Sequence, residues 1–436
     1  MSNGLANNSV VSLFSGALGL DLGLEQAGLK TRVAVEKDSD SCDTIRKNKP
    51  DTAVIEADAR EVTPAEILDA GGLENGDVFL VSGGPPCVTF SSGGNRQSIR
   101  DAEGSLFEDY LRVVSQIRPE YFVFENVANI VTAAIEHRPI EDRPGKDWNL
   151  STYSDDADPQ TDGDVAPLMP EEQSGSAIDV ILDAFENLGY TMTFFVLNAA
   201  DYGVPQHRKR LFIIGSRGGT TLRLPEATHG PPTVEDVKPR KTLRDAIDDI
   251  SGPLDHPEYS DAYQRFFAHV PQGGNWKDLS EDMQKEAMGG SYNSGGGRTG
   301  YFRRLSWDEP SPTVTKKPNR KSSAFCHPDE TRPLAVREWA RIQTFPDDWD
   351  FAGGTYSKYR QIGNAVPIQL ANSIGEMIID VHENGGANDA TAWTSDISRE
   401  TLLDAATDSI RQFANPHREY KPHTSDIYGP LQTTLS

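Results

Sequence analysis

Short apolar runs rich in β-branched residues alternate with segments of helical apolar spacing through the first half of the chain. A short apolar run bounded by polar or glycine-containing turns predicts a buried strand, and apolar positions three or four residues apart predict an amphipathic helix. Alternation of the two indicates a doubly wound, mostly parallel α/β sheet. The expected strands are residues 10–14, 31–35, 53–56, 77–81, 121–124, 191–197 and 210–214, and the expected helices are residues 20–27, 39–47, 105–117 and 177–188.

The pattern changes near residue 218. From there to about residue 330, proline and glycine become frequent and long apolar runs disappear, which predicts a second, smaller and irregular domain. Helical spacing returns at residues 333–339 and again at residues 368–381.

Four residues whose side chains could bind a ligand or take part in catalysis follow predicted strands directly or within a few positions: Glu36, Asp58, Cys87 and Glu125. In open α/β sheets, ligands bind in the crevice outside the carboxyl ends of the strands. The spacing therefore predicts a site at this edge of the sheet.

The turn after the first predicted strand contains Gly16 and Gly19, whose bare backbone would let a cofactor approach closely. Glu36 ends the next strand, where an acid can hold ribose hydroxyls. The same residues also fit a tight strand–helix turn with a surface glutamate, so the turn alone leaves both interpretations open.

Cys87 ends a Gly-Gly-Pro-Pro-Cys segment and precedes the polar stretch from Ser91. A lone cysteine is more often a small buried apolar residue, but such cysteines lie within apolar runs, as Cys87 does not. A nucleophilic thiol also needs a nearby acid or base, which Glu125 could supply if burial raises its pKa. By itself, Glu125 also fits an ordinary acid at the start of a helix.

Alternation along residues 206–210 places Arg208 and Arg210 on one face of an extended segment. Two neighbouring guanidinium groups require anions or polar acceptors there. The alternative is a solvated edge strand.

The composition is strongly acidic, with 66 Asp and Glu against 42 Lys and Arg and a formal net charge of −24. This appears unfavourable for a phosphate-binding protein, yet the charge is uneven. Residues 132–175 carry eleven acids and three bases, whereas residues 298–321 carry seven bases and two acids. The acidic bulk is typical of a halophilic composition, in which excess acids keep a protein soluble at high salt.

Three cysteines, Cys42, Cys87 and Cys326, form neither a disulfide framework nor a zinc pattern, and no metal site is expected. No apolar run approaches the roughly 20 residues of a membrane span. The N-terminal residues lack the pattern of a secretory signal. A cytoplasmic protein with no membrane partner is expected.

Six segments in order resemble the motifs of the DNA (cytosine-5)-methyltransferases. Gly84-Pro-Pro-Cys87 resembles the catalytic loop, Glu125-Asn-Val127 the ENV motif and Gln206-His-Arg-Lys-Arg210 the QxRxR motif. The others are residues 14–21 (FSGALGLD), which resemble the opening cofactor motif, residues 332–347 (RPLAVREWARIQTFPD) and residues 359–367 (YRQIGNAVP), which resemble the last two blocks. Leu18 stands where the family often has glycine, and Val88 where glutamine often follows the cysteine.

The resemblance implies a Rossmann-like S-adenosylmethionine-dependent methyltransferase fold and a domain organisation. It implies a catalytic and cofactor-binding domain at residues 8–217, with an acidic insert at about residues 132–175. A target-recognition domain follows at residues 218–330, the chain returns to the catalytic domain at residues 331–384, and residues 385–436 form an acidic C-terminal extension.

The resemblance also assigns roles to single residues. Cys87 adds to carbon 6 of cytosine, Glu125 holds and protonates ring nitrogen 3, Arg208 contacts the cytosine oxygen and Arg210 supports the loop. The cofactor residues implied are Phe14, Gly16, Gly19, Glu36 (ribose), Asp58 (adenine amino group), Pro85, Asn364 and Val366. The substrate residues expected are Ser91, Asn126, Arg303, Arg304, Lys316, Lys317 and Arg320.

The substrate implied is duplex DNA with the target base flipped out of the stack. The protein is expected to act as a monomer, with a paired restriction endonuclease as a candidate partner. A tRNA cytosine-5 methyltransferase and a catalytically silent DNA-binding relative are the alternatives. The long basic middle segment favours DNA over tRNA, and the presence of Cys87, Glu125 and Arg208 argues against a silent relative.

Overall fold

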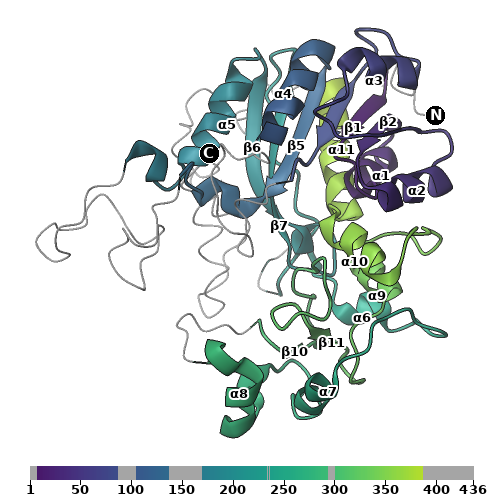
Figure 1. Cartoon of the computed structure of the whole chain (residues 1–436). Coiled ribbons are helices and arrows are strands. Elements are labelled where there is room, and N and C mark those ends of the chain that lie inside the picture. Colours follow the sequence, from purple (N-terminus) through teal and green to yellow (C-terminus); the bar gives the residue numbers. More distant parts are fainter. Residues whose placement is uncertain are drawn as a thin grey trace, which may run out of the picture.

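Seven strands form one mixed sheet at the centre of the computed structural model, which describes residues 7–86, 105–136, 169–232, 234, 236–292 and 300–385. Their order is β3-β2-β1-β4-β5-β7-β6 (Figure 1). Strand β7 runs antiparallel to both of its neighbours, and the other pairs in this sheet are parallel. The strands are β1 (Ser9–Leu13), β2 (Lys30–Glu36), β3 (Ala53–Glu56), β4 (Leu80–Gly83), β5 (Tyr121–Val127), β6 (Thr191–Asn198) and β7 (Lys209–Ser216).

Helices cover both faces of the sheet, as the apolar patterning predicts. One face packs against α3 (Pro64–Gly71), α4 (Ser105–Ile117) and α5 (Ser176–Glu186). The other packs against α1 (Gly19–Gln26) and the last helix, α11 (Ile368–Asn384). Helix α2 (Ser39–Asn48) contributes Ile45 to an apolar cluster that also contains residues of α1, of α9 (Val336–Ile342) and of α10 (Thr355–Asn364).

Close packing of α1 on α11 returns the end of the chain to the first strand of the sheet. A Cβ on Gly23 would lie 2.3 Å from the carbonyl oxygen of Ile368, and one on Gly375 would lie 2.6 Å from Cβ of Ala27. Two glycines therefore let the helix backbones approach closely. This contact places residues 363–366, just before α11, beside the turn at the start of α1.

The residues between β7 and α9 form a second, irregular body below the sheet in Figure 1. Its core is aromatic and includes Tyr259, Phe267 and Phe302. Its regular elements are short: β8 (His229–Gly230), β9 (Lys238–Pro239), α6 (Leu243–Ile247), α7 (Asp261–Phe267), α8 (Glu281–Met288), β10 (Arg303–Arg304) and β11 (Phe325–Cys326). Helices α9 (Val336–Ile342) and α10 (Thr355–Asn364) lead back to the sheet.

Short 3-10 turns occupy several connections, at Ala128–Thr132, Pro170–Glu172, Ala199–Tyr202, Trp276–Asp278 and Gly289–Ser291. The fold class expected from the sequence is confirmed, and most boundaries agree within two residues. Strand β4 begins at Leu80 and not at Asp77, and α9 begins at Val336 and not at Pro333. Helices α3 and α10 were not predicted. The greater part of the acidic insert and of the C-terminal extension lies outside the described residues.

Candidate active site

A cavity of about 550 Å³ opens at the carboxyl ends of the parallel strands. This is the edge at which the sequence predicts a site, and the volume is typical of a small-molecule pocket. Residues that are far apart in the chain line it: Phe14, Gly16, Gly19, Asp21, Glu36, Asp58, Pro85, Glu125, Asn126, Arg208, Arg210, Lys316, Asn364 and Val366. It therefore brings together all the predicted cofactor residues and, within the described part of the chain, all the predicted catalytic ones.

The turn between β1 and α1 has an unusual backbone. Gly16 has φ +52°, and a Cβ placed on it would meet nothing within 4 Å, so the cavity is open beside it. Phe14 and Leu18 also have positive φ angles, of 55° and 61°. Residues other than glycine rarely adopt a positive φ angle, and this backbone strain persists only where the surrounding structure enforces it. Burial of the Leu18 side chain in an apolar cluster provides that enforcement.

Glu36 is fixed at the end of β2 by backbone donors. The N–H of Gly16 donates to its Oε2 at 2.7 Å, and those of Lys37 and Asp38 donate to its Oε1 at 2.8 Å each. These bonds orient the carboxylate within the cavity wall. Three of its roughly four acceptor positions are used, which leaves capacity for a hydroxyl donor.

Asp58, after β3, is held mainly by Arg60. The guanidinium Nε and one terminal nitrogen donate to the two carboxylate oxygens at 2.9 and 2.7 Å. This pairing lowers the pKa of Asp58 to about 2, so the residue is an anion at the cavity edge. The expected contact of Asp58 with an adenine amino group stays a prediction.

Asp21 is a cavity-lining acid that the sequence interpretation did not select, although it belongs to the quoted motif. It is buried, and the hydroxyls of Ser12 and Ser82 donate to its two carboxylate oxygens at 2.8 and 2.7 Å. Ser12 on β1 is paired with Ser82 on β4, so Asp21 ties α1 to two adjacent strands. Burial raises its pKa to about 6. An acid within an apolar helix start was the available signal.

The pKa of Asp21 is higher in the folded than in the unfolded protein. Between about pH 4 and 6 the folded protein therefore keeps a proton on Asp21 that the unfolded chain has lost, and its stability falls as pH rises through that window. We expect Asp21→Asn to remove this dependence. Its free energy of unfolding, measured by urea titration, should rise relative to the unsubstituted protein between pH 4.5 and 7.5, by about 2 kcal/mol. A difference that stays constant across those pH values would contradict the prediction.

Glu125 and Arg210 form a buried ion pair in the cavity. Strands β5 and β7 are neighbours, and Nε of Arg210 lies 2.8 Å from Oε1 of Glu125. Burial raises the pKa of Glu125, while the charges of Arg210 and Arg208 act in the opposite direction. The carboxyl therefore retains a proton at higher pH than an exposed glutamate does.

The segment Gly84–Pro86 packs directly on this carboxyl group. A Cβ on Gly84 would lie 2.7 Å from Oε2 of Glu125, so a larger residue there would displace the carboxyl group. Asn126 holds the same segment, because its Nδ2 donates to the carbonyl of Pro85 at 3.2 Å. Asn126 was predicted to touch substrate, and the structure gives it this loop contact. Cys87 and Ser91 lie outside the described residues.

Arg208 faces the junction between the two bodies. It is 2% exposed, and its terminal nitrogens donate to the carbonyls of Val314 at 3.0 Å and Gly363 at 2.9 Å. The sequence interpretation placed Arg208 at the base and Arg210 in support. In the structure Arg210 pairs with Glu125 and Arg208 joins two loops, and contact of either with the base stays a prediction. Arg208 precedes β7, so its side chain reaches the loop carrying Val314, which alternation alone does not reveal.

The prediction that Arg304 contacts DNA is wrong. Arg304 is 6% exposed, and its guanidinium donates to the carbonyls of Phe267, Val270 and His327 at 2.6 to 2.8 Å. It satisfies backbone groups that the aromatic core would otherwise leave buried without partners. Net charge along a segment cannot distinguish such a residue from a surface base.

The other predicted DNA-contacting bases lie nearer the surface. Lys316 lines the cavity, Lys317 and Arg320 are exposed, and Arg303 is half-buried, with a pKa lowered by burial. The hydroxyl of Thr315, beside Lys316, is buried without a hydrogen-bond partner. The sequence interpretation did not select Thr315, because no motif or residue pattern around position 315 indicates that its hydroxyl is buried.

Among the described residues, no group of three or more acidic, histidine or cysteine side chains is placed to hold a metal ion. Within the same part of the chain, no helix is both long and apolar enough to cross a membrane.

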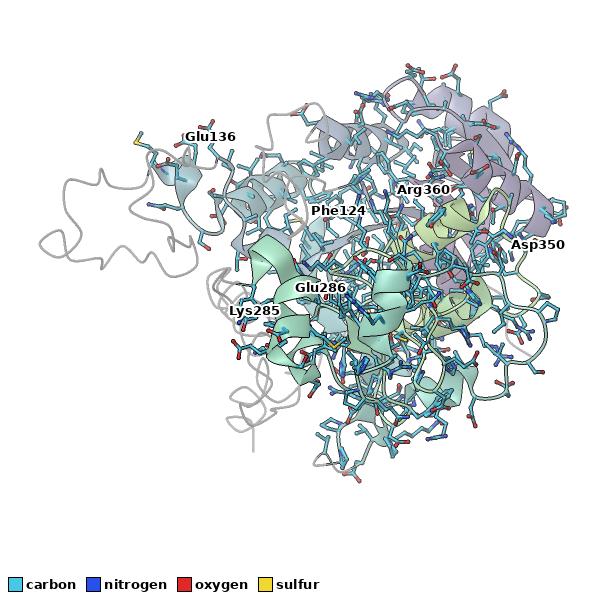
Figure 2. All side chains as sticks on the ribbon, turned by 60° about the horizontal axis from the view of Figure 1, so that its bottom comes forward. Phe124, Glu136, Lys285, Glu286, Asp350 and Arg360 are labelled. Atoms are coloured by element: carbon cyan, nitrogen blue, oxygen red, sulfur yellow. The ribbon has the colours of Figure 1, made fainter. Side chains whose placement is uncertain are left out.

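Figure 2 shows Arg360, a cavity-lining residue of α10, on the ribbon beside the sheet domain, and Lys285 and Glu286 on α8 in the second body.

Known proteins with similar sequences are methyltransferases. The family described as "C-5 cytosine-specific DNA methylase" matches residues 8–138 and 167–380. The chain is 38% identical over 380 residues to the type II methyltransferase M.Sau96I of Staphylococcus aureus, which covers 85% of this chain and 75% of that protein. It is 37% identical over 383 residues to the type II methyltransferase M.Eco47II of Escherichia coli, with 86% and 80% covered.

Solved structures share the fold. A DNA modification methyltransferase encoded within a prophage (E. coli) matches with a TM-score of 0.55 and 22% identity, over 86% of this chain and 99% of that one. A DNMT2 variant of Spodoptera frugiperda matches with a TM-score of 0.52 and 14% identity, over 86% and 100%. At these identities the likeness concerns the fold alone.

Proposed function

This chain belongs to the family of C-5 cytosine-specific DNA methylases, and from that premise we propose how its own residues carry out the reaction. The enzyme transfers a methyl group from S-adenosylmethionine to carbon 5 of cytosine in DNA. The observation that carries the assignment of residues is the shared cavity, in which the Glu125–Arg210 pair lies with Glu36 and Asn364.

The residues of the cavity suit S-adenosylmethionine. Glu36 is an oriented acceptor with capacity for a ribose hydroxyl, and the open backbone at Gly16 admits a ligand without steric conflict. Asn364 and Val366 line the cavity beside the turn at the start of α1. When bound there, the cofactor supplies an electrophilic methyl group. We assign the remaining cofactor contacts to Phe14, Gly19, Asp58 and Pro85, which line the same cavity.

Carbon 5 of cytosine is a poor nucleophile, so the protein must activate the ring. Cys87 adds as a thiolate to carbon 6 while Glu125 donates a proton to ring nitrogen 3, so carbon 5 becomes electron-rich. Burial raises the pKa of Glu125 and so favours the protonated form that this step needs. Once carbon 5 carries the methyl group it loses its proton to a base, the bond from Cys87 to carbon 6 breaks, and ring nitrogen 3 returns its proton to Glu125. Arg210 orients Glu125 and stabilises charge at the exocyclic oxygen on carbon 2 of the base, next to ring nitrogen 3. Arg208 fixes the loops around the base.

We propose residues 218–330 as the target-recognition domain, because residues between Tyr259 and Cys326 form an aromatic core of their own and Lys316 of the same segment lines the cavity. The target base must leave the stack to reach a buried cavity. Lys316, Lys317, Arg320 and the half-buried Arg303 are the basic residues placed for contact with phosphates. We assign Ser91 and Asn126 to contact with the substrate, and Arg304 is a core residue of the domain.

We further propose that the enzyme is a cytoplasmic monomer that works beside a paired restriction endonuclease. The support for the endonuclease is that similar proteins are named type II methyltransferases, the modification half of restriction systems. Light scattering on a size-exclusion column would test the monomer. Resistance of methylated DNA to endonuclease activity from the source cell would test the pairing.

Bisulfite mapping of DNA from cells that express the protein tests the function. We expect 5-methylcytosine at one recurring sequence, and purified protein should methylate duplex DNA and not tRNA. Methylation of tRNA alone would favour the alternative substrate. No methylation of either by folded protein that binds the cofactor would indicate a silent relative.

A further inference from the structure

Two glutamine side chains meet in the buried junction between the sheet and the second body. Gln206 precedes β7, and Gln343 ends α9; both are fully buried. Nε2 of Gln206 donates to Oε1 of Gln343 at 2.8 Å. The segment of Gln206 also bridges to the second body, since the N–H of His207 donates to the carbonyl of Ser311 at 2.8 Å.

Backbone groups fix the direction of this amide pair at both ends. The N–H of Val314 donates to Oε1 of Gln206 at 2.9 Å, so the amide nitrogen of Gln206 must face Gln343. Nε2 of Gln343 then donates to the carbonyls of Ile362 and Ala365 at 2.7 and 3.0 Å. If either amide rotated by 180°, two N–H donors or two carbonyl oxygens would face each other. A buried polar group left without a hydrogen-bond partner costs folding free energy, so both orientations are fixed.

The two carbonyls that Gln343 bonds lie on either side of a segment that lines the cavity. Ile362 and Ala365 flank Gly363 and Asn364, and the segment from Gly363 to Val366 lines the cavity. The segment has little freedom, because a Cβ on Gly19 would lie 2.5 Å from the carbonyl oxygen of Val366. The position of Asn364 therefore depends on where Gln343 holds the turn on either side of it.

We propose that Gln206 and Gln343 are positioning residues that transmit the placement of the strand carrying Arg208 and Arg210 to the cofactor-binding segment around Asn364. The inference rests on the proposed role of Asn364 and Val366 in the cofactor site. Neither glutamine lines the cavity, and the amide of Gln206 reaches the cofactor segment through Gln343.

The test uses isosteric replacement of each amide by a thioether in the full-length protein. We expect Gln343→Met to weaken S-adenosylmethionine binding about tenfold in calorimetry without DNA, well below the unfolding temperature. Its KM for the cofactor should rise similarly, while kcat at saturation stays within about threefold. Gln206→Met should weaken binding by a smaller factor, and the double variant should bind no more weakly than Gln343→Met alone.

Gln361→Met is the matched control. Gln361 is equally buried and partnered, since Thr44 donates to its Oε1 at 2.6 Å and its Nε2 donates to the carbonyl of Ala352 at 2.9 Å. We expect this variant to lower the melting temperature and to keep the cofactor Kd within about twofold. If Gln343→Met behaves like Gln361→Met, or if the Gln206 and Gln343 effects are fully additive, the proposal is overturned.

Asn364→Ala separates this proposal from the assignment of the site. If that variant binds the cofactor as tightly as the unsubstituted protein, the assigned cofactor wall is at fault. If Asn364→Ala weakens binding and Gln343→Met does not, the cofactor site is correctly assigned and only the positioning role of Gln206 and Gln343 is contradicted. Should Gln343→Met not fold, Gln206→Met still tests that role, because it leaves the bonds of Gln343 to Ile362 and Ala365 in place.

Discussion

Replacing Cys87 with serine is expected to reduce methyl transfer by at least about 10³-fold, as loss of an essential nucleophile does in other enzymes. A serine hydroxyl is far less ionised than a thiol at neutral pH and adds poorly to carbon 6. Cofactor binding should persist, because the described cavity wall is built from other residues. Rates of tritium transfer to duplex DNA and calorimetry with S-adenosylmethionine measure the two effects separately.

A duplex with 5-fluorocytosine at the target position gives a second measure. Fluorine at carbon 5 cannot leave as a proton does, so the covalent adduct persists after methyl transfer. The unsubstituted enzyme should form a complex that survives denaturant, and Cys87→Ser should not. Cys326→Ser is the control, since Cys326 is buried in the second body with its Sγ 3.3 Å from the carbonyl of Glu330. Full activity in Cys87→Ser would overturn the mechanism.

The sequence located the site because strand ends can be read from local patterns. Glu36 and Glu125 lie within predicted strands or at their ends, and parallel strands must bring those ends to one edge. The direction of β7 could not be read in this way. Alternation is the same in parallel and antiparallel strands, and only the path of the chain decides between them.

Helix α10 shows a different limit of sequence reasoning. Its sequence, TYSKYRQIGN, is polar and ends in glycine and asparagine, yet Tyr359 and Ile362 are buried between α9 and the cavity. Two apolar positions give too weak a periodicity to predict a helix. The contacts that stabilise it, including the bond from Gln343 to Ile362, come from residues distant in the chain.

The roles of the arginines depended on contacts that no local pattern encodes. Arg208, Arg210 and Arg304 each follow or precede another base and look alike in sequence. One joins loops, one pairs with Glu125 and one fills the second core. Buried guanidinium groups need several acceptors in a fixed geometry, and remote segments supply them: backbone carbonyls for Arg208 and Arg304, and the Glu125 carboxylate for Arg210.

Replacing Glu125 with glutamine is expected to lower kcat by about 10²- to 10⁴-fold, the usual contribution of a general acid. The amide can still accept a hydrogen bond from Arg210, so the geometry of the pair survives. It cannot release a proton to ring nitrogen 3. Binding of S-adenosylmethionine should be unchanged, and single-turnover methylation measures the chemical step directly.

The pH dependence identifies the role of Glu125. Burial raises its pKa, so the protonated, active form persists above the range of an exposed glutamate and is lost as pH rises through the raised value. The unsubstituted enzyme should therefore lose activity on that alkaline limb, and the residual activity of Glu125→Gln should lack it. Glu338→Gln is the control, because Glu338 forms an equally buried pair with Arg332 at 2.8 Å outside the cavity lining. This control should keep the limb even if it melts at lower temperature. Retention of the limb in Glu125→Gln would assign proton donation to another group.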